Sequence, residues 1–273
     1  MIEKPHKIAP FLRWAGGKNW FVKHLNNYLP KDGFNDYHEP FLGGGSIFFN
    51  IQTRNSFLSD VNEDLIVAYT EIRDNVEEVI IELQQFKNTE DYYYLIREQI
   101  NNSYRTKEAA KFIFLNQTSY NGIYRVNLNG KYNVPYGFRS KDFFQPDNLR
   151  HASNALKNAK IFASDFTKIL PNIKTGDLVF LDPPYTVSHY NNGFIKYNSK
   201  LFSEQDQIRL SKLISEIKNM GAFYIMTNAD HDQVHEIFKC NGDRFTTQER
   251  ASLIGGKNSK RGIYKEAIYT NVF

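Results

Sequence analysis

The segment at residues 179–185 reads VFLDPPY, three apolar residues followed by an acid, two prolines and an aromatic ring. The apolar run predicts the end of a buried strand, and the prolines stop that strand, so Asp182 should lie at the carboxyl edge of a sheet. Ligands of open α/β sheets bind at this edge. There, the carboxylate, the carbonyl of Pro183 and the ring of Tyr185 suit a planar group that carries an amine. A plain surface turn is an alternative for so short a motif.

A glycine-rich turn forms a second candidate site. Residues 42–46 read LGGGS and lie between a strand predicted at residues 37–41 and an apolar helix predicted at residues 47–52. Glycines let a ligand approach the backbone closely, and the free N–H groups at the helix start can bind it. The dinucleotide-binding fingerprint would have another glycine where this chain has Phe48, so the pattern indicates a nucleotide-like site without a pyrophosphate.

Asp60 ends the next predicted strand, residues 56–60. It lies 17 positions after Gly43, close to the spacing of about 20 residues at which an acid can accept hydrogen bonds from ribose hydroxyls. A helix N-cap is the alternative, because Asp60 and Asn62 precede a helical pattern, and one residue can serve both purposes. Asp165 and Phe166 follow a third predicted strand in the same manner.

These residues need a single sheet whose strand ends meet at one edge. Strands that alternate with helices predict a parallel sheet, and a final strand pair around a basic loop predicts an antiparallel end. We therefore expect an α/β fold with a Rossmann-like doubly wound sheet and an antiparallel C-terminal strand pair. The predicted strands are residues 37–41, 56–60, 160–164, 177–181, 222–227, 245–250 and 264–273, with a helix at residues 204–220.

A mostly helical insertion interrupts the sheet. Helical patterns run from residue 75 to residue 117, and Asn129-Gly130 between alternating apolar residues predicts a β-hairpin. Residues 86–160 hold 12 Lys plus Arg but 6 Asp plus Glu, which favours a nucleic-acid-binding face over an ordinary solvated one. The predicted division is a sheet-forming domain at residues 1–65 and 160–273 and an inserted, mostly helical domain at residues 66–159 that carries the hairpin.

Composition limits the class of protein and its compartment. The chain has 273 residues, 41% hydrophobic content, a net charge of +4 and one cysteine, Cys240. A single cysteine excludes an intrachain disulfide framework and a thiolate-rich zinc site. Neither a signal peptide nor an apolar run of about 18 residues is present. We expect a soluble, cytoplasmic protein with no membrane partner; its oligomeric state has no signal in the sequence.

Three further patterns are weaker. Residues 16–18 read GGK, but the leading glycine of a phosphate-binding P-loop is missing and Asn19 replaces its Ser or Thr, so we reject that interpretation. His231 and His235 have helical i, i+4 spacing, yet a solvated helix face is favoured over a metal site because a third ligand is lacking. The basic loop at residues 255–261 is either a phosphate contact or a mobile turn.

Four motifs in order resemble the Dam-like N6-adenine DNA methyltransferases, of the class whose target-recognition insertion lies between the cofactor motif and the catalytic motif. The resemblance spans essentially the whole chain, and the first and third motifs are more specific than the fourth. The motifs are FLRWAGGK at residues 11–18, EPFLGGGS at 39–46, NGxxR at 121–125 with NVP at 133–135, and DPPY at 182–185.

The resemblance implies S-adenosylmethionine as cofactor, S-adenosylhomocysteine as its product, and no required metal. Asp165 and Phe166 match the positions that hold the adenine of the cofactor, a carboxylate to its amino group and a ring against its face. The implied cofactor-binding residues are Trp14, Lys18, Gly43, Gly45, Asp60, Asp165, Phe166 and Asp182.

The resemblance also implies double-stranded DNA as substrate, within restriction–modification or a related system. Arg125 matches the arginine that reads a guanine, whose O6 and N7 suit a bidentate guanidinium. Arg13 replaces a family lysine that touches a base, which keeps the charge but changes its geometry. The implied site contains GATC or another sequence around an adenine. The other implied DNA-binding residues are Tyr120, Asn121, Ile123 and Pro135.

Adenine chemistry gives the catalytic motif its expected role. The N6 lone pair is delocalised and unreachable inside a duplex, so the base must be flipped out. Asp182 and the carbonyl of Pro183 can accept the two N6 hydrogens, while Tyr185 stacks on the extruded ring. Alternatives are a methyltransferase acting on RNA or a protein amide, which would not need the basic hairpin, and a non-catalytic DNA-binding homologue, which would not need the cofactor residues.

Overall fold

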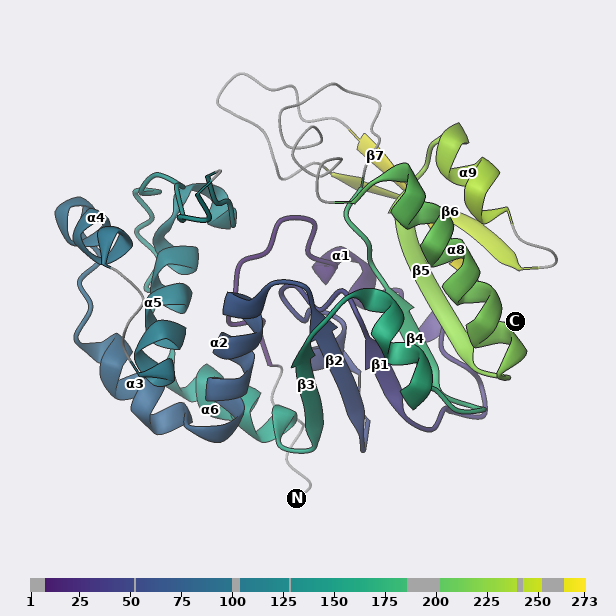
Figure 1. Cartoon of the computed structure of the whole chain (residues 1–273), viewed down its shortest axis with the longest axis horizontal. Coiled ribbons are helices and arrows are strands. Elements are labelled where there is room, and N and C mark those ends of the chain that lie inside the picture. The colour runs from purple at the N-terminus through teal and green to yellow at the C-terminus, as the bar shows by residue number, and fades with distance from the viewer. Residues whose placement is uncertain are drawn as a thin grey trace. The chain divides into compact units, whose positions relative to one another are not determined.

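Seven strands form one sheet in the order β3-β2-β1-β4-β5-β7-β6 (Figure 1). The computed structural model describes residues 8–51, 53–99, 104–127, 129–185, 202–239, 243–251 and 263–273. The strands are β1 (Tyr37–Glu39), β2 (Ser56–Asp60), β3 (Ala159–Ala163), β4 (Leu178–Leu181), β5 (Phe223–Ala229), β6 (Arg244–Ala251) and β7 (Ile263–Thr270).

Four neighbouring strands, β2, β1, β4 and β5, are parallel. Strand β7 lies between β5 and β6 and is antiparallel to both of them. Strand β4 is buried along its whole length, as expected of a strand covered on both faces. The expected Rossmann-like sheet with an antiparallel C-terminal pair is confirmed.

Helices account for most of the remaining described residues. The longer ones are α2 (Glu63–Asp74), α3 (Val76–Gln84), α4 (Glu90–Glu98), α5 (Arg105–Thr118), α6 (Pro146–Leu156), α8 (Glu204–Asn219) and α9 (Asp232–Phe238). The single-turn and 3-10 elements are α1 (Asn19–Val22), η1 (Leu25–Asn27), η2 (Phe48–Asn50), η3 (Tyr120–Gly122) and η4 (Phe166–Asn172). Among the residues described, no helix has both the length and the apolar character needed to cross a membrane.

The chain divides into two compact units, which are described separately. The first comprises Met1–Val22, Gly43–Gln52 and Asn62–Ala163, and the second comprises Lys23–Leu42, Thr53–Val61 and Ser164–Phe273. The domain boundaries expected from the sequence stay a prediction.

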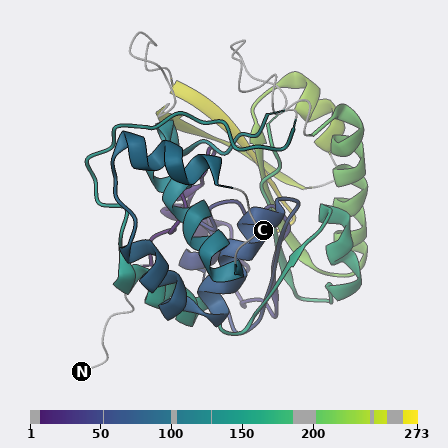
Figure 2. The same ribbon diagram turned by 60° about the vertical axis from the view of Figure 1, so that its left-hand side comes forward.

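The first unit is built around α5, against which α2, α3 and α4 pack (Figure 2). Helix α2 begins where the side chain of Asn62 accepts the N–H of Leu65 at 3.0 Å, so Asn62 is the N-cap. On α5, Phe114 is fully buried and makes edge-to-face contacts with Phe86 and Phe143, each at a ring-centroid distance of 5.1 Å. The aromatic excess of this region therefore fills its core.

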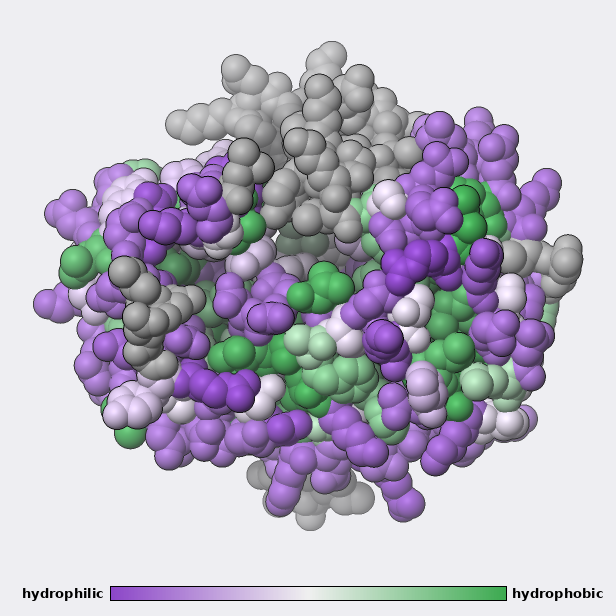
Figure 3. Space-filling model, in the orientation of Figure 1, coloured by the Kyte–Doolittle hydropathy of each residue, from purple (hydrophilic) through white to green (hydrophobic). Residues whose placement is uncertain are grey.

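The second unit packs α8 on the sheet beside β5 and on α9. Helix α8 begins with a capping box: Ser203 Oγ accepts the N–H of Asp206 at 3.2 Å, and the carboxylate of Asp206 accepts the N–H of Ser203 at 2.9 Å. Hydrophilic residues, purple in Figure 3, cover much of the visible surface.

One local expectation was wrong. The apolar helix expected at residues 47–52 is a single 3-10 turn, closed by bonds such as that from the N–H of Asn50 to the carbonyl of Ile47 and ended by an extended Ile51. The hairpin expected around Gly130 is present in an irregular form, in which isolated antiparallel bridges join Val126 to Tyr132 and Ser119 to Tyr136. The side chain of Asn127 accepts two backbone N–H groups inside this loop, which satisfies them without a strand ladder.

Candidate cofactor and target-base site

Polar and aromatic side chains lie at or near the carboxyl ends of the parallel strands of the second unit. The register pairs Glu39 with Leu58, His38 with Val179, and Leu181 with Met226. Continuing the β4–β5 register by one residue aligns Asp182 with Thr227, while Asp60 is the last residue of β2 and Phe41 follows the end of β1. The structure thus brings Asp60 and Asp182 to the same edge, where open α/β sheets bind ligands.

Asp182 is held by a partner on β5, and Tyr185 by a partner on β7. Thr227 Oγ1 donates to Asp182 Oδ1 at 2.8 Å, and the Tyr185 hydroxyl donates to Glu266 Oε2 at 2.6 Å. Pro183, which follows Asp182 in the chain, is buried. Burial raises the pKa of Tyr185, and the negative charges of Glu266 and Asp182 raise it further. Tyr185 is therefore a neutral phenol whose hydroxyl group is anchored by Glu266.

Replacing Glu266 by alanine should lower the free energy of unfolding by about 1–3 kcal/mol, since the Tyr185 hydroxyl then loses a buried acceptor. Glu266 is 2% exposed. The matched control is Glu249→Ala, which removes the same side chain from an exposed position on the adjacent β6. Urea denaturation would compare the two variants, and equal losses would show that Glu266 does not support Tyr185.

Asp165 and Phe166 also lie in the second unit, at the start of η4. Asp165 Oδ1 accepts the N–H of Thr167 at 3.0 Å, its hydroxyl at 2.6 Å, and Arg209 Nη2 at 2.7 Å. Partial burial pushes the pKa of Asp165 up, but these hydrogen bonds outweigh it and the net pKa is lowered. The backbone N–H of Ser164 donates to the carbonyl of Asp60 at 3.0 Å, which ties the two expected cofactor acids together.

The ring of Phe166 is 3% exposed and covered by neighbours. It stacks on Phe41 at a centroid distance of 5.3 Å and packs against Phe202 at 5.7 Å. Phe41, which directly follows β1, is half-exposed. The more accessible ring of this cluster is therefore that of Phe41. This residue belongs to the EPFLGGGS motif, but the family resemblance implied no role for it.

The glycine turn belongs to the first unit, and its conformation explains its composition. Gly43 and Gly45 have φ values of +46° and +65°, in the left-handed region that favours glycine. A Cβ atom on Gly43 would lie 2.6 Å from Trp14 Cδ1, and one on Gly45 would lie 2.6 Å from the hydroxyl oxygen of Tyr69. That hydroxyl donates to the carbonyl of Gly43 at 3.2 Å. The turn is thus closely packed on one side by Trp14 and Tyr69.

Gly45→Ala should destabilise the protein by about 2 kcal/mol or more, because left-handed strain and a steric clash add together. Gly33→Ala is the matched control: Gly33 has a φ of +83°, but no atom lies within 4 Å of its added Cβ. Thermal unfolding should therefore show a smaller loss for Gly33→Ala. Equal losses in the two variants would mean that the packing around Gly45 is not restrictive.

Trp14 and Lys18 flank the glycine turn within the same unit. The indole of Trp14 stacks on Tyr124 with 5.7 Å between ring centroids and 21° between planes. Lys18 is buried, and its ammonium group donates to the carbonyl of Gly16 at 2.7 Å. Trp14 thus contacts both the glycine turn and the residue that precedes Arg125.

The expected DNA-binding residues cluster in the first unit. Arg125 is exposed and held by Asn133: Nε donates to the side-chain oxygen at 2.8 Å and Nη2 to the carbonyl at 3.2 Å. The N–H of Tyr120 donates to the carbonyl of Pro135 at 2.9 Å. Tyr120, Asn121 and Pro135 are exposed, and Ile123 is half-buried. Four of the side chains that the family resemblance assigns to DNA, those of Tyr120, Asn121, Arg125 and Pro135, are therefore accessible to solvent.

Arg13 has a structural tie that the sequence did not indicate. Its Nη1 donates to the carbonyls of Ser119 at 3.1 Å and Gln117 at 3.3 Å. A Cβ on Gly122 would lie 2.4 Å from Arg13 Cβ, so the side chain packs directly on that glycine. Burial lowers the pKa of Arg13, and the charge of Arg139 lowers it further. Arg13 anchors the segment that carries Tyr120 and Asn121.

Sequence reasoning missed the supporting residues Thr227, Glu266, Arg209 and Tyr124. Thr227 lies on β5, the strand next to β4, so its proximity to Asp182 could be predicted once the order of the strands is known. Glu266 is an acid within the β-favouring run of β7. These residues act through long-range contacts that no local pattern contains.

The weaker sequence patterns have mixed outcomes. His235 is not on a solvated face, because its Nε2 pairs with Asp230 Oδ1 at 2.8 Å and its Nδ1 with the hydroxyl of Tyr269 at 2.6 Å. Within the described part of the chain, no group of three or more His, Cys, Asp or Glu side chains is arranged to hold a metal ion. The basic loop at residues 255–261 and Cys240 lie outside the described residues.

The parallel sheet with an inserted antiparallel strand, the glycine turn after β1 and the acid-Pro-Pro-aromatic segment after β4 define a Rossmann-like α/β protein. The family model described as "D12 class N6 adenine-specific DNA methyltransferase" matches residues 14–251. The chain belongs to this family, which confirms the resemblance and the enzyme class inferred from the sequence.

Named relatives cover nearly the whole chain. The Type II methyltransferase M.MjaIII of Methanocaldococcus jannaschii is 32% identical over 96% of this chain and 99% of its own length. The Type II methyltransferase M1.LlaDCHI of Lactococcus lactis subsp. cremoris is 31% identical over 97% and 95%. A DNA adenine methylase of Haemophilus influenzae is 31% identical over 96% and 93%.

Proposed function

We propose that this chain transfers the methyl group of S-adenosylmethionine to N6 of an adenine flipped out of duplex DNA. The observation that carries the proposal is the segment after β4, where Asp182 is held by Thr227 and Tyr185 by Glu266. Both side chains are oriented by buried partners before any base arrives. Such preorganisation is what a reaction limited by alignment requires.

Asp182 and Pro183 act on the amine. The N6 lone pair of adenine is delocalised into the ring, so it is a poor nucleophile until its hydrogens are held out of the ring plane. The carboxylate of Asp182 and the carbonyl of Pro183 are acceptors for those two hydrogens. Holding both draws N6 toward a tetrahedral geometry and localises the lone pair for attack on a methyl carbon.

Tyr185 receives the extruded base. Flipping costs a few kcal/mol of stacking and pairing, and an aromatic ring in the pocket offsets part of that cost. The hydrogen bond to Glu266 fixes the position of the hydroxyl end of the Tyr185 side chain. The side chain therefore contributes stacking without taking part in proton transfer, in keeping with its raised pKa.

The residues proposed for the cofactor fit its chemistry. S-adenosylmethionine supplies an electrophilic methyl group on a sulfonium. In the first unit, Gly43 and Gly45 leave the backbone without side chains beside Trp14. In the second unit, Asp60 is an acceptor for ribose hydroxyls and Asp165 an acceptor for an amino group.

Recognition of the sequence is proposed for the surface around Arg125, with Tyr120, Asn121, Ile123 and Pro135 beside it and Arg13 supporting it. Asn133 holds one edge of the Arg125 guanidinium, so its outer edge is oriented for the O6 and N7 atoms of a guanine. We propose a site that contains GATC.

The test is transfer of labelled methyl from S-adenosylmethionine to duplex DNA containing every short site around an adenine, followed by mapping of the methylated adenines. The expected result is N6-methyladenine at one sequence, with no transfer to RNA or to protein. Transfer to RNA or protein in place of DNA would overturn the proposal. Methylation of DNA at a site without GATC would overturn the assigned sequence alone.

A further inference from the structure

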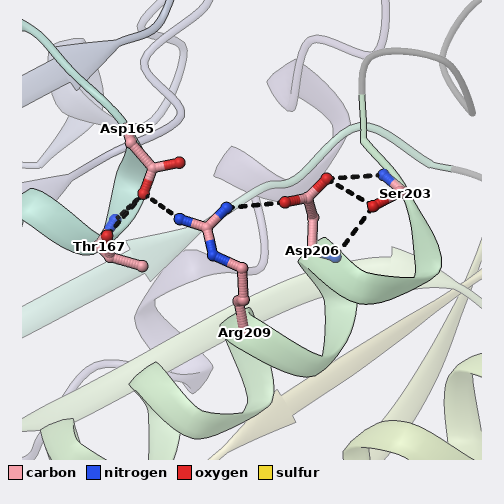
Figure 4. A network of polar contacts seen from close by, with 5 residues as sticks. All are labelled: Asp165, Thr167, Ser203, Asp206 and Arg209. Carbon is pink, nitrogen blue, oxygen red and sulfur yellow. Dashed lines mark hydrogen bonds and ion pairs between the residues drawn. The ribbon is translucent and has the colours of Figure 1, made fainter.

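Arg209 on α8 bridges two carboxylates at the carboxyl edge of the sheet (Figure 4). Its Nη2 donates to Asp165 Oδ1 and its Nη1 to Asp206 Oδ1, both at 2.7 Å. The two contacts use different nitrogens, so the guanidinium is fixed at both ends. A side chain held in this way can hold its partner in turn.

The contacts of Asp165 are concentrated on one oxygen. Oδ1 accepts from Arg209 and twice from Thr167. Figure 4 shows the other oxygen, Oδ2, without a contact to the residues drawn, and no donor among the described residues reaches it. The carboxylate is therefore locked through Oδ1, while Oδ2 is presented as an oriented acceptor.

The guanidinium also lies on an aromatic ring. Its central carbon is 4.9 Å from the ring centroid of Phe166, which in turn stacks on Phe41. A planar, delocalised cation suits this position better than a lysine ammonium, because it can bridge two acids and cover a ring at once. The position of Arg209 thus depends on the shape of arginine as well as on its charge.

The far end of the bridge is itself anchored. Asp206 belongs to the capping box of α8, in which Ser203 donates to its carboxylate from both N–H and hydroxyl, at 2.9 and 2.8 Å. The first turn of the helix therefore sets the place of Asp206, and Asp206 sets that of Arg209. The orientation of the Asp165 carboxylate therefore depends on the first turn of α8, through Asp206 and Arg209, as well as on the loop that carries Asp165.

We propose that Arg209 is a positioning residue that makes Asp165 Oδ2 selective for the exocyclic amine of the cofactor's adenine. This inference rests on the proposed function, which assigns that amine to Asp165. A carboxylate oxygen accepts a hydrogen bond from a 6-amino group, whereas it repels the 6-oxo group of hypoxanthine. When the direction of Oδ2 is fixed, the difference in affinity between the amino and the oxo compound is large. A carboxylate free to rotate could turn away from the oxo group and lose the discrimination.

A pH effect accompanies the selectivity. The pKa of Asp165 is lowered, although its burial alone would raise it, because hydrogen bonds from Thr167 and Arg209 favour the charged form. Acceptance of the amine needs the carboxylate, so it is present above this pKa and lost as pH falls through it. Without Arg209 the pKa of Asp165 rises, and the loss of binding should begin at a higher pH.

The experiment compares binding of S-adenosylhomocysteine and S-inosylhomocysteine by titration calorimetry in the full chain. We expect the wild type to prefer the adenosyl compound. Arg209→Ala should weaken its binding by about tenfold, the size of one oriented hydrogen bond, and reduce the preference by a similar factor. Arg209→Lys should retain part of both. In turnover, the effect should fall on the KM for the methyl donor rather than on kcat.

Arg150→Ala is the matched control. Arg150 also lies on a helix, α6, and bridges two acids, Glu77 and Asp147. Its side chain is 46% exposed, against 40% for that of Arg209. It should change neither the preference nor the pH profile. An unchanged preference in Arg209→Ala would overturn the inference, and Arg209→Lys provides the same test if the alanine variant does not fold. Failure of the wild type to bind S-adenosylhomocysteine at all would instead overturn the proposed function.

Discussion

Asp182→Ala should lower methyl transfer to duplex DNA by at least about 100-fold, since one preorganised group that acts in the transition state is removed. DNA binding should stay within a few-fold of wild type, because the proposed DNA-reading residues belong to the first unit and Asp182 to the second. Single-turnover methylation and gel-shift measurements would give the two quantities separately. Loss of DNA binding with an unchanged rate of bound-state transfer would contradict the assigned role.

Two neighbouring substitutions make that test sharper. Asp182→Asn keeps an acceptor oxygen but loses the charge, so it should retain more activity than alanine. Thr227→Val removes the donor that holds Asp182 Oδ1 while keeping the shape of the side chain. It should therefore give a smaller loss, confined to the rate of transfer. A Thr227→Val variant as inactive as Asp182→Ala would mean that Thr227 has a direct role in the reaction.

Arg125→Ala should relax recognition at one base pair by about 10- to 100-fold, in line with about 1–3 kcal/mol for a bidentate contact to guanine. The measurement is the ratio of kcat/KM on the preferred duplex to that on duplexes with single substitutions. Asn133→Ala should reduce the same ratio less, because Arg125 remains but loses the partner that orients it.

Lys131→Ala is the control for charge alone. Lys131 is exposed and lies in the same loop, so its loss should weaken binding to all duplexes alike and leave the ratio unchanged. If Lys131→Ala and Arg125→Ala behave identically, Arg125 contacts only the phosphate backbone and the assignment of base reading is wrong.

The strands and their acidic ends could be predicted from the sequence because their signals are local. An apolar run followed by an acid located Asp60 and Asp182 at strand ends, and β2 has the predicted bounds. The antiparallel final pair was also predictable, from two strand patterns that flank a short basic loop. The partners of the acids were not, since Thr227 is 45 positions from Asp182 and Glu266 is 81 positions from Tyr185. Strand pairing, not sequence proximity, brings these residues together.

The departures from regular elements have a common physical origin. The 3-10 turn at Phe48–Asn50, where a helix was expected, and the irregular hairpin around Gly130 are both short segments whose conformation depends on packing more than on propensity. Gly45 adopts a left-handed conformation against Tyr69, and Asn127 closes its loop with its own side chain. A periodicity argument sees only the apolar residues and therefore extends each element too far.

The stack of Trp14 on Tyr124 gives the molecule an optical probe of its own. The chain has two tryptophans, Trp14 and Trp20. The indole of Trp14 touches the glycine turn on one side and the residue next to Arg125 on the other. Its fluorescence is thus sensitive to events at either neighbour, and a Trp20→Phe background leaves it as the single emitter. Cofactor and DNA titrations can then be followed without an attached dye.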